Sequence, residues 1–153
     1  RAVDLAAQSA LESDDPEGLA GCISAYGRIA ASAAAQGFVD IARIAGEAET
    51  KTCYELGSTH TDPSALRRCI DGVERRLACD QAALNADDLA GAFRLLGHCH
   101  AELGHLNQDP EAFRAAIRAY EASLKPVQRE AQAAVIRLTE QNIRLCKAAI
   151  TRP

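Results

Sequence analysis

The chain repeats itself at a fixed interval, and this periodicity constrains its fold more than any other feature of the sequence. An Asp-Pro pair begins at Asp15, Asp62 and Asp109, so both steps are 47 residues long. The segments that follow align as DPEGLAGCISAY, DPSALRRCIDGV and DPEAFRAAIRAY. Self-similarity at such a period is typical of arrays in which one small structural unit is stacked on its neighbours. We therefore expect one unit that is copied along the chain.

Each unit reads as two helices joined by a loop. An Asp before a Pro is a strong helix start, because the carboxylate caps free N–H groups and proline fits the first helical position. Gly57 and Gly104, 47 residues apart, are interpreted as C-caps that end the preceding helices. Apolar residues in 112–124 recur at intervals of three and four, which places them on one helical face: Phe113, Ala116, Ile117, Tyr120 and Leu124. Because no alternating Val, Ile, Thr or aromatic runs occur, we expect helices throughout and no sheet.

The register predicts the boundaries of the units. We expect a single domain over 1–153, with units at about 1–36, 37–83 and 84–130 and a last helix at about 131–150. Cys146 lies 47 residues after Cys99, so the last helix corresponds to the first helix of a fourth unit. A lone final helix of this kind is expected to cap the array. Cys22 and Cys69 occupy the register position of Ala116, where a small buried side chain lets helices approach.

The third unit resembles a known family. Phe93-x-x-Leu96-Gly97-x-x-His100-x-x-x-Gly104 resembles the first helix of a tetratricopeptide repeat (TPR), and Ala116-Ile117-x-x-Tyr120-Glu121-x-x-Leu124 is similar to its second helix. The usual unit has about 34 residues, so the resemblance is to the longer variants found in bacterial repeat arrays. Thr139-Glu140-Gln141-Asn142-Ile143 resembles the start of units in such arrays. The resemblance implies an all-α fold, with stacked antiparallel helix pairs forming a short right-handed superhelix (solenoid) and a C-terminal capping helix.

The resemblance also implies a site. The first helices of TPR units line a concave groove that binds a peptide or protein segment, and the matching positions here are Glu47, Lys51, Tyr54, Glu55, Arg94, His98, Glu102 and Gln141. We therefore expect a protein–protein interaction scaffold for a segment of mixed charge, in which His98 confers pH sensitivity near neutrality. The other interpretation left open is that these charges only pair along exposed helices, as Glu47 and Lys51 can at i, i+4.

Charge and motifs exclude several other functions. The 17 Lys and Arg residues against 21 Asp and Glu give a net charge of −4, which disfavours a nucleic-acid or membrane-surface partner. We expect no membrane span and no secretory signal, and hence a cytoplasmic protein, although the start at Arg1 without Met suggests a processed or excised chain. No nucleophile elbow, phosphate loop or His-Glu-x-x-His motif is present, so we expect no enzyme and no cofactor.

The six cysteines and the segment Gly97-His98-Cys99-His100, with His105 nearby, raise the question of metal or disulfide chemistry. The cysteines form no Cys-x-x-Cys pair, and consecutive helical residues point about 100° apart, so the His and Cys side chains cannot converge on one ion. We expect no metal site, and a Cys/His metal or redox binder stays an alternative. A second alternative is a self-assembling module that forms homo-oligomers through its exposed N-terminal repeat. A third is a sensor domain that regulates an attached effector.

Overall fold

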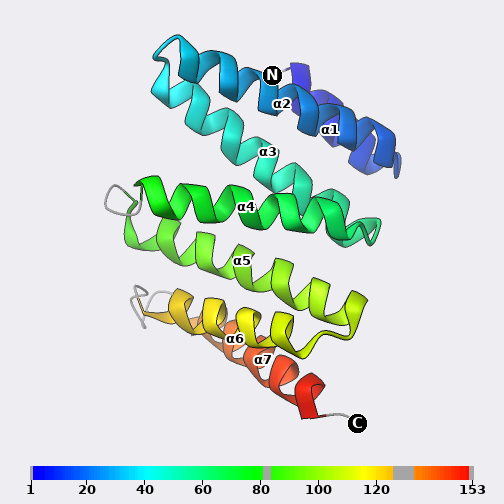
Figure 1. The fold of residues 1–153 in the computed structure, drawn as a ribbon, viewed down its shortest axis with the longest axis vertical. Helices are drawn as coiled ribbons and strands as arrows, with labels where there is room; N and C mark the ends of the chain where they lie inside the picture. The colour runs from blue at the N-terminus through cyan, green and yellow to red at the C-terminus, as the bar shows by residue number, and fades with distance from the viewer. Residues whose placement is uncertain (1, 81–83, 126–132, 152–153) are drawn as a thin grey trace. The chain divides into compact units, whose positions relative to one another are not determined.

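The computed structural model describes residues 2–80, 84–125 and 133–151 (Figure 1). Within these ranges the secondary structure is helical, without strands, which confirms the all-α prediction. The helices are α1 (Ala2–Glu12), α2 (Pro16–Ala35), α3 (Val39–Thr59), α4 (Pro63–Asp80), α5 (Ala86–Asn107), α6 (Pro110–Leu124) and α7 (Ala133–Thr151). No helix in the described part is both long enough and apolar enough to cross a membrane. The expected unit boundaries at 83 and 130 lie outside the described residues.

The three Asp-Pro pairs start helices, as predicted. The carboxylates of Asp15, Asp62 and Asp109 each accept a hydrogen bond from a backbone N–H two or three residues further on, at 2.9, 2.8 and 2.9 Å. Each proline is the first residue of its helix. The same cap is therefore built three times, at the predicted interval.

The turn before each of these helices repeats as well. Asp14, Thr61 and Gln108 adopt left-handed backbone conformations, with φ of 55°, 53° and 51°. The N–H of the next residue donates in each case to the carbonyl five residues before it, at 2.8, 3.1 and 3.0 Å. This 6→1 bond is the one that defines a Schellman-type helix end. A left-handed conformation costs a non-glycine residue about 1–2 kcal/mol, so its recurrence every 47 residues indicates one turn design used three times.

The prediction that Gly57 and Gly104 are C-caps is wrong. Both glycines lie inside helices, because α3 continues to Thr59 and α5 to Asn107. A Cβ atom on Gly57 would lie 2.6 Å from Leu66 Cγ, and one on Gly104 would lie 2.8 Å from the ring of Phe113. The glycines are therefore required by the close approach of the following helix.

The same contact recurs in two helix pairs, α3 with α4 and α5 with α6. The residues that approach the glycines, Leu66 and Phe113, are 0% and 5% exposed, and Leu19, which has the same register position in the first repeat, is 1% exposed. Further along the third pair, a Cβ on Gly97 would lie 2.6 Å from the ring of Tyr120. Because residue 104 meets residue 113 while residue 97 meets residue 120, α5 and α6 run antiparallel.

The chain divides into two compact units, Arg1–Gly72 and Val73–Pro153. In the first unit, α2 packs against both α1 and α3 (Figure 1), and residues 63–72 of α4 pack against the end of α3. Cys22 and Cys69 are 7% and 0% exposed, which confirms their predicted burial. Arg68 of α4 donates two hydrogen bonds to Glu49 of α3, at 2.9 and 2.6 Å, and this ion pair lies beside Gly27 of α2.

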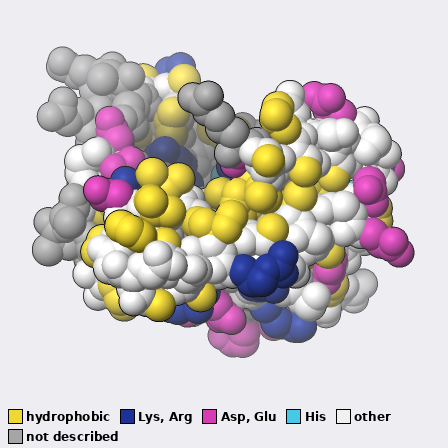
Figure 2. Space-filling view, turned by 90° about the horizontal axis from the view of Figure 1, so that it is seen from above, with side chains coloured by type: hydrophobic (Ala, Val, Ile, Leu, Met, Phe, Trp, Pro, Cys, Tyr) yellow, Lys and Arg dark blue, Asp and Glu magenta, His cyan; other side chains and the backbone are white. Residues whose placement is uncertain are grey.

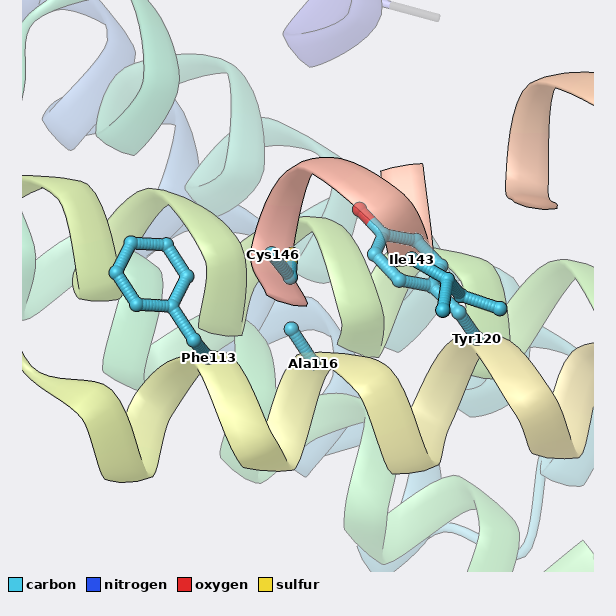
Figure 3. Close-up of a cluster of buried hydrophobic side chains, with 5 residues drawn as sticks. All are labelled: Phe113, Ala116, Tyr120, Ile143 and Cys146. Atoms are coloured by element: carbon cyan, nitrogen blue, oxygen red, sulfur yellow. The ribbon is translucent and has the colours of Figure 1, made fainter. Parts of the chain in front are cut away.

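In the second unit, α6 packs against both α5 and α7. Figure 3 shows Phe113, Ala116 and Tyr120 of α6 with Ile143 and Cys146 of α7, and these five side chains form a buried cluster. The helix α7 confirms the last predicted helix, whose residues 131 and 132 lie outside the described part.

Candidate binding cleft

A cleft of about 340 Å³ lies in the first unit, where α1 and α3 flank α2. It is lined by Asp4, Ala7, Gln8 and Leu11 of α1, Leu19 and Tyr26 of α2, and Ala48, Lys51, Thr52 and Glu55 of α3. Two of the eight predicted groove residues, Lys51 and Glu55, thus lie in one concave surface.

The base of the cleft is held together by a hydrogen bond between α1 and α2. The hydroxyl of Tyr26, a buried residue, donates to Asp4 Oδ1 at 2.6 Å. This bond lowers the pKa of Asp4, while burial and the neighbouring carboxylate raise the pKa of Tyr26. At neutral pH the pair is therefore a neutral phenol and a carboxylate, and the bond anchors α1 to α2.

Lys51 and Glu55 stand one helical turn apart on the α3 wall. Lys51 is exposed and Glu55 is partly buried. In the described part of the chain neither side chain has an ion pair or a hydrogen bond. The neighbouring Thr52 directs its hydroxyl back to the carbonyl of Ala48, at 2.8 Å. The cleft therefore presents one ammonium, from Lys51, and two carboxylates, from Glu55 and Asp4. Among its apolar side chains, Leu11 is 39% exposed.

The 47-residue register relates Lys51 to two side chains that lie in hydrogen-bonding distance of a tyrosine. One position on the first helix of each repeat holds Asp4, Lys51 and His98 in turn. The matching position on the second helix holds Tyr26, Val73 and Tyr120. In the first repeat Asp4 bonds Tyr26, and in the third His98 Nδ1 lies 2.9 Å from the hydroxyl of Tyr120. The side chain of Val73 has no hydroxyl, so the middle repeat lacks the tyrosine that the other two repeats carry.

His98 is engaged in the second unit. Its ring is partly buried and packs edge-on against Tyr120, with ring centroids 5.4 Å apart. Burial lowers the pKa of His98, and the charge of Arg94 lowers it further. His98 is therefore mainly neutral at pH 7.

The remaining predicted residues are spread over the helices. Glu47 accepts a hydrogen bond from Arg43 at 2.8 Å, so its observed i, i+4 partner is Arg43 and not Lys51. Tyr54 is partly buried on α3, Arg94 and Glu102 are partly buried on α5, and Gln141 is exposed on α7.

Sequence reasoning missed the α1 side of the cleft. Asp4 and Gln8 precede Lys51 and Glu55 by 47 residues, so the register itself carried this signal.

It also missed a second, more open depression of about 480 Å³ near the turn between α2 and α3, lined in part by Arg28, Ile29, Phe38 and Ile41. On the face seen in Figure 2, hydrophobic side chains lie next to basic and acidic ones.

The six cysteines are free thiols. The two whose pKa is shifted, Cys53 and Cys146, are protonated at neutral pH. All six lie in the described part, and none is in a disulfide; five are buried and Cys79 is exposed. Burial raises the pKa of Cys53 to about 12 and also raises that of Cys146. Over residues 2–80, 84–125 and 133–151, no three His, Cys, Asp or Glu side chains come together as a metal site.

Comparison with known proteins returns no relative: the chain matches no protein-family model, no curated protein and no solved structure.

Proposed function

We propose that the chain is a TPR-like scaffold that binds a protein or peptide segment in the cleft between α1 and α3. The recurring caps, left-handed turns and antiparallel contacts support a stacked arrangement of helix pairs. The observation that carries the proposal is the pair of unpartnered opposite charges, Lys51 and Glu55, beside apolar side chains in one concave surface. Side chains that mainly stabilised the fold would be paired with neighbours, as Arg68 and Glu49 are.

The chemistry of the cleft describes its ligand. A segment with an acidic residue opposite Lys51 and a basic residue opposite Glu55 would satisfy both charges. An exposed ion pair contributes only about 0.2–1 kcal/mol, so most of the affinity must come from an apolar side chain that covers the exposed part of Leu11. The ligand is therefore a short segment of mixed charge with at least one large apolar residue. The proposed activity is binding, without catalysis and without a cofactor.

A charge swap tests this function. The immobilised chain is compared with the double variant Lys51→Glu, Glu55→Lys in capture of proteins from source-cell lysate. The matched control is Arg67→Glu, Asp71→Lys, which exchanges two exposed charges four residues apart on α4 of the same unit. Both variants keep the net charge of the chain, and circular dichroism verifies their helix content.

The proposal predicts a protein that is retained by the unmodified chain and by the control but lost by the Lys51 and Glu55 variant. Retention of the same proteins by all three chains would show that the cleft is not the binding surface.

A further inference from the structure

The outer face of α7, in the second unit, carries an apolar stripe. Its inner face is buried on α6 through Thr139, Ile143 and Cys146. The stripe lies on other positions, spaced four and three residues apart: Ala134, Leu138, Leu145 and Ala148, with the polar Gln141 between the two leucines. This spacing keeps the five side chains on one helical face. Leu138 and Leu145 are each 57% exposed, so much of their apolar surface is left in water.

The 47-residue register shows what this face is built to meet. Leu145 occupies the position of Asp4 and His98 in the first and third repeats. Those two side chains bond a tyrosine on the second helix of their own pair, at 2.6 and 2.9 Å. Ala148 likewise occupies the position of Ala101, which packs against the buried cluster on α6. At Leu145 and Ala148 the outer face of α7 therefore has the register positions that meet a second helix in other repeats, whereas Leu138 has the position of Ile44, which is 57% exposed.

Charge distinguishes between the helices that could dock there. Arg137 and Arg144, seven residues apart, follow one edge of the stripe; both are exposed, and neither has an ion-pair partner in the described part of the chain. If α7 of a second copy docked antiparallel, the same edges would meet and arginine would face arginine. Acidic side chains on the docking helix would instead be attracted.

We propose that the outer face of α7 is a docking site for an amphipathic helix of another protein, with apolar residues at helical spacing and Asp or Glu along one edge. This site is separate from the cleft in the first unit, so either can fail without the other.

The probe is a fluorescent synthetic helical peptide with Leu at the apolar positions and Glu at the flanking positions, and its twin carries Lys in place of Glu. Fluorescence anisotropy measures binding of both peptides to the full chain. We expect the acidic peptide to bind about fivefold or more tightly than its twin, because two exposed ion pairs replace two repulsions.

Variants then locate the site. Leu138→Ser with Leu145→Ser should weaken binding of the acidic peptide by at least about tenfold, since the apolar contact is lost. Arg137→Glu with Arg144→Glu should reverse the preference between the two peptides. The control is Leu5→Ser on α1, a leucine that is 68% exposed, and it should bind like the unmodified chain. All five substituted positions are exposed, and circular dichroism verifies the fold.

Three results would overturn the proposal. The first is no binding of the acidic peptide, or equal binding of both peptides. The second is binding that survives the double leucine substitution or is lost in the Leu5 control. The third is a dimer detected by light scattering that rises with concentration and disappears in the double leucine variant, because a second copy would then be the occupant.

Discussion

Replacement of Gly57 by alanine tests the packing that the repeat imposes. A Cβ at this position would lie 2.6 Å from Leu66 Cγ, 2.7 Å from Leu66 Cδ2 and 3.0 Å from the Leu66 backbone nitrogen. Carbon atoms pack optimally at about 3.5–4.0 Å, and a backbone atom cannot rotate away. The α3–α4 contact must therefore open, and overpacking of this kind costs about 1–3 kcal/mol.

The matched control is Gly21→Ala on the exposed side of α2, where an added Cβ has no heavy atom within 4 Å. Alanine in a helix interior is favoured over glycine by about 0.8–1 kcal/mol, and both variants gain this amount. Their difference isolates the packing term, so Gly57→Ala should be less stable than Gly21→Ala by about 1–3 kcal/mol.

The assay is urea unfolding followed by circular dichroism, with the midpoints compared at constant slope. In a Leu66→Ala background the two side-chain clashes are removed, so the penalty of Gly57→Ala should shrink. Equal stabilisation by Gly57→Ala and Gly21→Ala would refute the close approach of α3 and α4 at this point.

Three further outcomes follow from the structure. Asp62→Ala removes an N-cap whose pKa is lowered by its hydrogen bonds from Ser64 and should destabilise the chain by about 1 kcal/mol in urea unfolding. Burial lowers the folded-state pKa of His98 and His100 below the ordinary 6.5, so below about pH 6.5 the unfolded chain binds more protons than the folded chain. The free energy of unfolding should therefore be highest above about pH 6.5 and should fall below it. A flat profile from about pH 7.5 to 5.5 would contradict this. Of the six thiols only Cys79 is exposed, so a thiol reagent should label one cysteine quickly in the folded chain and all six in urea; rapid labelling of several would contradict the burial of the others.

Much of the local structure could be predicted from the sequence, because it depends on short-range chemistry. The Asp-Pro pairs specify both the cap and the first helical residue, and the apolar spacing specifies the buried face of α6. The role of Gly57 was misread because a glycine without a side chain serves either a left-handed turn or a close contact. Only the position of Leu66 distinguishes the two.

The site was predicted less completely, since it depends on contacts between helices. The bond from His98 to Tyr120 joins residues 22 apart in sequence and follows from the antiparallel pairing of α5 and α6. The α1 wall of the cleft could have been predicted from the 47-residue register. The apolar side chains that line the cleft could be identified only from the folded structure. The exposure of Leu138 and Leu145 could not be predicted, because an apolar residue on a helix is normally expected to be buried.

Site-specific photocrosslinking tests the central claim, which is that the cleft between α1 and α3 binds a protein segment. A photoreactive amino acid is placed at Gln8 or Ala48, which line opposite walls of the cleft, or at the exposed Ser24 on α2. The chain is illuminated with the partner captured from lysate, and the adducts are analysed by mass spectrometry. The account predicts adducts from the two cleft positions and none from position 24. Adducts formed equally from all three positions, or only from position 24, would contradict it.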